Sequence, residues 1–243
     1  MKTVLITGGT RGIGYSIAVK FAKNDYNLVL NYVSDTQNAN KVKEELEKIY
    51  HIRVLLLKAD VSNEEDVKFI YKESLKHFDF VDCVVNNAGV AIDTILENKT
   101  VDNFKRILGV NLIGPFLINK YFGRNMFENH KGNIINISST NAIDTYYPES
   151  MDYDASKAGL ISLTKNFAKS YSPYVRVNAI ACGWVNTDMN KDMDYEYKKN
   201  EESKILLNRF ANSEEIANVV YFLATDEASY INGSVIRVDG GCR

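Results

Sequence analysis

Short apolar runs recur along this chain and are separated by segments in which apolar residues return every three or four positions. The amphipathic segments predict helices at 15–23, around 42–49, from SNEED (62–66) onward, and at 102–129, 152–171 and 213–225. The apolar runs predict strands at 2–7, 27–33, 53–60, 80–89, 133–138, 175–181 and 234–241. Because these strands are apolar on both faces, helices should cover both sides of a parallel sheet.

This alternation of strands and helices predicts a single doubly wound, Rossmann-type α/β domain over residues 1–243, with a seven-stranded parallel sheet. No Pro/Gly-rich linker or low-complexity run divides the chain, and 243 residues suit one α/β domain. A formal net charge of −2 argues against nucleic-acid or anionic-membrane partners. Three scattered cysteines, no signal peptide and no spanning apolar run favour a reducing cytoplasm.

The stretch TGGTRGIG (7–14) follows the first predicted strand and opens the first helix. Gly8, Gly12 and Gly14 permit a tight turn that brings backbone amides to a pyrophosphate at a helix N-terminus, so a dinucleotide site is predicted. An acidic residue at the end of the second strand would select NAD, but Asn31 stands there. Arg11 is either a solvated loop residue or the partner of a 2′-phosphate, and the second interpretation favours NADP(H) over NAD(H).

Polar residues also follow the third and fourth strands, where ligands of such sheets bind. Asp60 and Val61 are candidates for the adenine edge, and Asn87, Ala88 and Gly89 for backbone close to the dinucleotide. Asn, Asp and Gly are also common turn formers, so a purely structural turn is the alternative at each place.

Tyr153 precedes Lys157 by four residues in MDYDASKAG, a spacing that puts both side chains on one helix face. Tyr195 and Lys199 repeat the spacing, but in a charged run with no strand-end partners. The lysine cation should depress the pKa of Tyr153, and Ser139 at the end of the fifth strand is placed to hydrogen-bond a substrate carbonyl. These residues suit carbonyl reduction, with hydride from a nicotinamide.

Asn111 is a poor helix former inside the predicted helix 102–129, and Pro115 follows four residues later. A kink or local opening is therefore expected there, freeing backbone groups to hold a water.

Five motifs together resemble the short-chain dehydrogenase/reductase family over the whole chain: TGGTRGIG (7–14), NNAG (86–89), the asparagine of VNL, the serine of ISS and YDASK (153–157). The resemblance implies that Tyr153 is the acid-base group and that Lys157 also binds the nicotinamide ribose. It implies that Ser139 orients the carbonyl, with Ser138 as its fallback, and that Asn111 anchors a water. It adds further expected cofactor contacts at Thr10, Ile13, Gly183, Val185 and Thr187.

Within the family the chain is most similar to 3-oxoacyl-[acyl-carrier-protein] reductases, through its length and the tail 208–241. That likeness implies NADPH-dependent reduction of a 3-oxoacyl thioester, a cytoplasmic role in fatty acid biosynthesis, and a homotetramer.

The chain departs from that pattern in three places. Cys182 replaces the proline expected before Gly183, as either a packing residue or a reactive thiol. The loop TNAIDTYYPESMD (140–152) carries Tyr146, Tyr147, Pro148 and Glu149 where small, glycine-rich sequence is usual. These bulky aromatics and the carboxylate suggest a smaller or more polar substrate, or a subunit contact. Tyr174 stands where a carrier-protein-binding cation is expected, although Lys131 and His130 offer some charge.

Other classes fit less well. An α/β-hydrolase needs a G-x-S-x-G elbow and a late histidine, and the sequence has neither; no clustered His/Cys set suggests a metal. A non-catalytic NADP(H)-binding protein is an alternative, but it would be expected to lose one of the four catalytic residues. The substrate stays open between an acyl thioester, a sugar or polyol, a steroid and another small ketone or alcohol. The charge-rich segment 188–207 is expected to form a mobile substrate lid.

Overall fold

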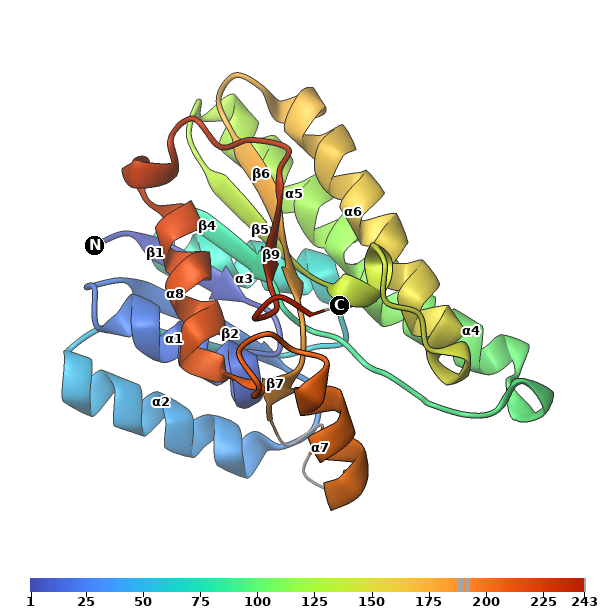
Figure 1. Cartoon of the computed structure of the whole chain (residues 1–243). Coiled ribbons are helices and arrows are strands. Elements are labelled where there is room, and N and C mark those ends of the chain that lie inside the picture. Colours follow the sequence, from blue (N-terminus) through green and yellow to red (C-terminus); the bar gives the residue numbers. More distant parts are fainter. Residues whose placement is uncertain (188–189, 191–192, 243) are drawn as a thin grey trace.

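Seven parallel strands form one sheet in the computed structural model, which describes residues 1–187, 190 and 193–242 (Figure 1). Their order across the sheet is β3-β2-β1-β4-β5-β6-β9, and every neighbouring pair runs parallel. The predicted fold class is thus confirmed. The strands are β1 Thr3–Ile6, β2 Asn27–Tyr32, β3 Val54–Lys58, β4 Cys83–Asn86, β5 Asn133–Ser139, β6 Arg176–Cys182 and β9 Val235–Val238.

Helices cover both faces of this sheet. On one face lie α1 (Gly12–Ala22), α2 (Thr36–Tyr50) and α8 (Ser213–Ala224); on the other lie α3 (Glu64–Phe78), α4 (Val101–Leu108), α5 (Gly114–Glu128) and α6 (Met151–Tyr171) (Figure 1). The chain order reverses between β1 and β4, so the crevice where such sheets bind dinucleotides opens at the carboxyl ends of these strands.

The core divides along the pleat of the strands. Val4 and Ile6 of β1 face one side and pack in a cluster with Phe21 of α1, whereas Leu5 faces the other side in a cluster with Phe122 of α5. All of these side chains are buried. Burying each large apolar side chain contributes about 1.5–3 kcal/mol, which is why the near-continuous apolar strands predict a sheet covered on both faces.

The predicted long helix 102–129 is interrupted where Asn111 and Pro115 suggested. It comprises α4, a π-helical turn at Gly109–Ile113, and α5. Pro115 has no amide hydrogen to donate to the carbonyl of Asn111 four residues earlier, which accounts for a local widening at this place.

The sequence did not predict a small second sheet, in which β7 (Val185–Asn186) pairs with β8 (Ala211–Asn212). Part of the expected lid is a helix, α7 (Tyr195–Ser203), anchored by a buried residue, Glu201. Residues 188–189 and 191–192 of that expected lid lie outside the described residues. Within the described part of the chain, no helix combines the length and apolar character needed to cross a membrane.

Among the described residues, short 3₁₀ turns lie at Leu96–Asn98, Thr140–Ala142, Pro148–Ser150 and Asp226–Ala228.

Candidate active site

The loop between β1 and α1 has the backbone of a phosphate-binding turn. Gly8 (φ 61°) and Gly12 (φ 53°) adopt the left-handed conformation. A Cβ on Gly14 would lie 2.1 Å from the carbonyl oxygen of Gly8, so a side chain there would collide with backbone. Arg11 is exposed and precedes the first turn of α1 without a side-chain cap bond. The helix N-terminus and the guanidinium together form an arrangement suited to anions.

Two other residues of this loop attach it to α2 and to the core. Thr10 is buried, and its carbonyl accepts a hydrogen bond from Asn38 Nδ2 (2.8 Å). Ile13 packs against the core. The Thr10 carbonyl and the Ile13 side chain therefore hold the loop in place, and the predicted contact of both residues to a cofactor remains a prediction.

The end of β4 is bonded directly to the glycine loop. Asn87 Nδ2 donates to the carbonyls of Thr7 (3.0 Å) and Gly8 (3.1 Å), and the backbone amides of Asn87 and Ala88 both donate to Thr7 Oγ1 (3.0 Å). The NNAG motif therefore shapes the crevice between β1 and β4.

Asn31 lies at the predicted place near the end of β2, but its amide faces the neighbouring strand. Its Nδ2 donates to the carbonyls of Ala59 (2.8 Å) and Leu57 (3.3 Å), and the residue is buried. Asp35 beyond it accepts from Asn38 N and caps α2. Asn31 thus secures strand pairing here, while its contact to a cofactor ribose remains a prediction.

Asp60 stands at the end of β3, where an adenine contact was expected. Its carboxylate accepts from Ser62 Oγ (2.7 Å) and from Arg106 (2.8 Å). Desolvation acts to raise the pKa of Asp60, but these hydrogen bonds outweigh it and lower the pKa. Val61 is buried and packs against Gly114, so its side chain is part of the core.

Tyr153 and Lys157 project from the same face of α6 toward the end of β5. The Nζ of Lys157 lies 5.5 Å from the centroid of the Tyr153 ring and donates to the carbonyl of Ile137 (2.8 Å). Lys157 is almost fully buried, and this burial lowers its pKa from 10.5 to about 8.

The expected lowering of the Tyr153 pKa by Lys157 is wrong for this structure. Burial of the phenol raises its pKa above the usual range, the nearby Cys182 thiol adds to this, and a hydrogen bond with Ser139 offsets only part of the rise. The free-energy cost of taking the phenolate out of water is larger than the stabilisation that the Ser139 hydrogen bond gives it. Tyr153 is therefore a protonated donor at neutral pH.

The two serines at the end of β5 point in different directions. Ser138 Oγ donates to the carbonyl of Lys157 (3.1 Å) inside the core, so the fallback serine is engaged with α6. Ser139 Oγ instead contacts Tyr153 and accepts from Asn141 N (3.2 Å). Of the two serines, Ser139 is the one beside the phenol.

Asn111 joins this group from the π-helical turn. Its Oδ1 accepts from Val90 N (2.9 Å), and its Nδ2 donates to Val90 O (2.9 Å) and Ser156 Oγ (3.1 Å). An ideal Cβ on Gly89 would lie 3.5 Å from Asn111 Oδ1 and 3.6 Å from Lys157 Nζ, so Gly89 lies between the two side chains. The structure thus brings Asn111, Ser139, Tyr153 and Lys157 together.

Cys182 behaves as a packing residue. It is buried in the core cluster, and burial raises the pKa of its thiol to about 12 despite the nearby Lys157. The neighbouring Gly183 donates its amide to Val238 O (3.0 Å), which holds the chain against β9. The packing interpretation is favoured, because a thiol with so high a pKa is a poor nucleophile.

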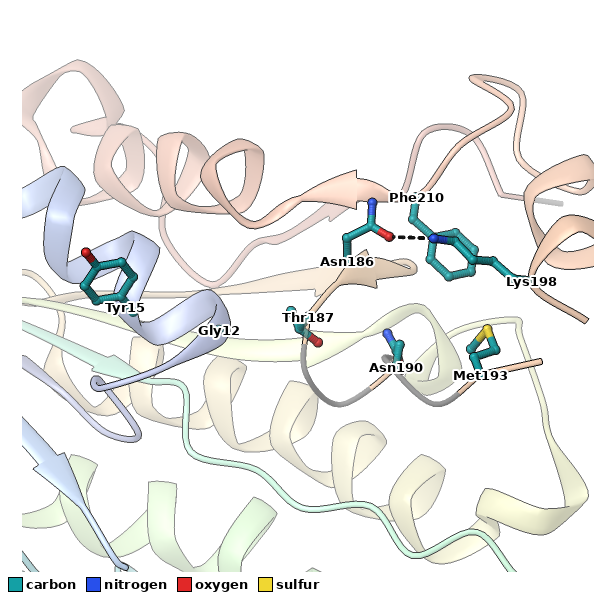
Figure 2. A pocket seen from close by; sticks show the side chains of 8 residues that line it. All are labelled: Gly12, Tyr15, Asn186, Thr187, Asn190, Met193, Lys198 and Phe210. Carbon is teal, nitrogen blue, oxygen red and sulfur yellow. Dashed lines mark hydrogen bonds between the residues drawn. The ribbon is translucent and has the colours of Figure 1, made fainter. Parts of the chain in front are cut away.

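A cavity of about 490 Å³ lies beside the glycine loop (Figure 2). Thr187 approaches Gly12 at one end, within 3.8 Å of an ideal Cβ there, while Val185 is buried below. The four predicted catalytic residues do not line this cavity, which lies on the glycine-loop side of the crevice. Its described lining residues are Gly12, Tyr15, Asn186, Thr187, Asn190, Met193, Lys198 and Phe210.

Sequence reasoning missed a buried ion pair at the start of α6. Lys99 Nζ lies 3.0 Å from Asp152 Oδ1, and the two side chains are 2% and 0% exposed. Lys99 also donates to the carbonyls of Ile92 (2.8 Å) and Glu149 (2.7 Å), while Asp152 Oδ1 accepts from Tyr153 N. These two charges fix the turn that carries Tyr153. The only signal in the sequence was an acidic residue in a first helical turn.

It also missed contacts that organise the loop between β5 and α6. Asp154, beside Tyr153, accepts from Asn141 Nδ2 (2.8 Å) and from Tyr147 N (3.3 Å). Asn141 is the residue that contacts Ser139. One carboxylate thus ties the loop to the residues around the phenol.

A family profile described as "Enoyl-(Acyl carrier protein) reductase" matches residues 8–243. The 3-oxoacyl-[acyl-carrier-protein] reductase FabG of Aquifex aeolicus is 37% identical over 241 residues, covering 99% of this chain and 96% of that protein. Glucose 1-dehydrogenase 2 of Bacillus subtilis is 35% identical over 244 residues, covering 99% and 94%. A solved short-chain dehydrogenase/reductase from Serratia marcescens BCRC 10948 matches with a TM-score of 0.93 and 32% identity, covering 99% of this chain and 97% of its own.

Proposed function

Because this chain belongs to the short-chain dehydrogenase/reductase family of oxidoreductases, we propose that it reduces a carbonyl to a secondary alcohol with NADPH, preferring a 3-oxoacyl thioester. The observation that carries this proposal is that the Tyr153 phenol, the buried Lys157 and the Ser139 hydroxyl meet where the carboxyl end of β5 faces the first turns of α6. The 3-oxoacyl substrate is supported by several relatives named 3-oxoacyl-[acyl-carrier-protein] reductase.

The glycine loop, the N-terminus of α1 and the adjoining cavity fit a dinucleotide, because Gly8 and Gly12 turn the backbone at a helix N-terminus and Gly12 leaves that backbone open to the cavity. When bound there, a reduced nicotinamide supplies a hydride to the carbonyl carbon. Arg11 is exposed beside this loop, and Asp35 is engaged in capping α2, which supports a 2′-phosphate on the cofactor.

The residues of this chain would handle the proton. The Ser139 hydroxyl hydrogen-bonds the carbonyl oxygen, and the Tyr153 hydroxyl gives its proton to that oxygen as the C=O bond becomes C–OH. The resulting phenolate lies near the Lys157 ammonium, whose lowered pKa suits it to return a proton at neutral pH. Asn111, held by Val90 and Ser156 beside the widened turn, would anchor the water that restores the lysine proton.

An acyl-carrier protein is less well supported as the donor of the thioester. The Nζ of Lys131 lies over the Phe80 ring at 4.1 Å, and His130 stacks on Tyr174 at 4.0 Å. Both basic residues are thus engaged with aromatic rings, which leaves a modest positive surface for an acidic carrier.

The experiment follows absorbance at 340 nm, a wavelength at which only the reduced cofactors absorb. Reduction of acetoacetyl-CoA is measured as loss of NADPH or NADH, and oxidation of glucose is measured as formation of NADPH or NADH from the oxidised cofactor. NADPH-dependent reduction of acetoacetyl-CoA, lost in Tyr153→Phe, supports the proposal. Glucose oxidation without thioester reduction would favour the second candidate, a sugar dehydrogenase, which the Bacillus subtilis relative suggests. NADPH binding without turnover of any carbonyl or alcohol would indicate a non-catalytic protein.

The assembly is also a proposal. Ile113 at the end of the π-helical turn and Phe116 at the start of α5 are exposed, and Phe116 packs on Phe167 of α6. An apolar surface along α5 and α6 supports a homotetramer, which light scattering on the purified protein tests.

A further inference from the structure

Glu201 of α7 is a charged residue that the proposed chemistry does not use, although it is only 2% exposed. Its Oε2 accepts hydrogen bonds from Tyr147 Oη (2.6 Å) and Trp184 Nε1 (3.2 Å), and its Oε1 pairs with Lys204. A buried carboxylate is costly without such partners, so this arrangement holds α7 against two loops. Tyr147, Trp184 and Glu201 are called the α7 latch below.

The α7 latch joins the loops that follow β5 and β6. Ser139 and Cys182 end these strands in register with one another. Trp184 follows Cys182 by two residues, and Tyr147 lies in the loop that Asp154 ties to Asn141 beside Ser139. The latch therefore spans the carboxyl edge of the sheet next to the predicted catalytic residues.

The strand order and one aromatic contact place the latch relative to the cavity. The dinucleotide crevice opens between β1 and β4, and β5 and β6 come next in the order. Trp184 stacks on Phe210 (5.3 Å, 10°), and Phe210 lines the cavity beside the glycine loop (Figure 2). The latch thus lies next to that cavity, at the ends of β5 and β6, and the rest of a substrate held by Ser139 and Tyr153 would extend toward it.

We propose that the α7 latch sets an upper limit on substrate length, so that the site takes short-chain 3-oxoacyl thioesters and excludes long ones. This inference rests on the proposed function for the identity of the substrate. The Tyr147 and Trp184 rings meet edge to face (6.0 Å, 70°) and form a wall of aromatic surface. A long acyl chain would have to displace that wall and leave the Glu201 carboxylate without its donors.

The test compares kcat/KM for 3-oxoacyl-CoA thioesters of increasing chain length, from four to twelve carbons, in wild type and Tyr147→Ala. Removing the ring should raise the ratio of long-chain to short-chain kcat/KM by about tenfold or more, because each methylene admitted to an apolar site contributes to discrimination. The matched control is Tyr146→Ala, since the neighbouring Tyr146 is 73% exposed, and among the described residues its hydroxyl bonds within its own loop, to Ile143 O. An unchanged ratio in a folded Tyr147→Ala that binds NADPH would overturn the inference.

A second measurement, of tryptophan fluorescence, detects changes in the α7 latch without enzymatic turnover. Trp184 is the only tryptophan of the chain, so intrinsic emission reports this site alone. Glu201→Gln should shift that emission and relax the length limit partly, whereas Glu202→Gln should do neither.

If neither wild type nor any variant reduces a thioester, the proposed function fails. Binding of acyl-CoA thioesters of different length then tests the length limit separately. Butanoyl-CoA and dodecanoyl-CoA are titrated into each protein in the presence of NADP⁺, followed by a displaced fluorescent CoA analogue. Tighter binding of the long thioester to Tyr147→Ala alone supports the length limit. Equal binding by wild type and variant contradicts it.

Discussion

Lys99 and Asp152 come from segments 53 residues apart in sequence, yet their side chains form a buried ion pair directly beneath the turn that carries Tyr153. Replacing Lys99 by Met should cost about 3–5 kcal/mol of unfolding free energy, because it leaves the Asp152 carboxylate buried and without its cation. Urea unfolding measures this.

The matched control is Lys105→Met. Lys105 pairs with Asp102 at the surface, where the side chains are 73% and 94% exposed, so the change should cost about 0.5 kcal/mol or less. Equal costs for the two variants would show that the buried pair has no special role.

Tyr153→Phe should lower kcat by about 10²–10⁴-fold while NADPH binding stays near the wild-type value. The ring remains and only the donated proton is lost. Tyr195→Phe is the control, because Tyr195 has the same spacing to a lysine but is 72% exposed on α7. Retained turnover in Tyr153→Phe would require another proton donor.

The reductase rate at saturating NADPH should fall as the pH rises through about 8, the value to which burial lowers the pKa of Lys157. Above that pH the ammonium beside Tyr153 is lost. Lys157→Arg keeps its charge, so whatever its absolute rate, its profile should stay flat to higher pH. A wild-type profile that is flat to pH 10 would contradict this assignment.

The same pKa shift affects folding. Between about pH 8 and 10.5 the unfolded chain retains a proton that native Lys157 has released. The free energy of unfolding therefore gains a contribution from Lys157 that increases with pH across this window. Comparing pH-dependent unfolding of wild type with Lys157→Met isolates it, since the variant lacks that increment.

Arg11→Ala should weaken NADPH binding by about ten- to a hundredfold and leave NADH binding nearly unchanged, because only NADPH carries the 2′-phosphate. Lys20→Ala, at the other end of α1 where the lysine lies over the Tyr221 ring, is the control. Fluorescence titration of each reduced cofactor gives the dissociation constants. Equal losses for both cofactors would reassign Arg11 to the shared pyrophosphate.

Most of the fold could be predicted from the sequence, because the strands and the widened helical turn depend on residues that are close together in the chain. Apolar strands such as 27–33 need cover on both faces, and Pro115 cannot donate to Asn111, so the sheet and the widened turn followed from residue types alone. The glycine loop is also a local matter, since Gly8 and Gly14 approach each other within seven residues.

The missed features depend on distance through space. Tyr147 and Glu201 are 54 residues apart, and nothing in either segment indicates the other. The direction of the Asn31 amide depends on β3 as a neighbour, and the raised pKa of Tyr153 depends on how completely the fold encloses it. Such properties arise from packing, which a linear pattern does not encode.

The opposite orientations of Ser138 and Ser139 imply a rule for how this protein tolerates insertions and deletions. Adjacent strand residues face opposite sides, so losing a single residue within β5 would turn Ser139 into the core and bring another side chain beside Tyr153. The exposed loop positions near Tyr146 have no such alternation to preserve. Length variation among functional relatives should therefore be confined to that loop, while the number of residues in β5 stays constant.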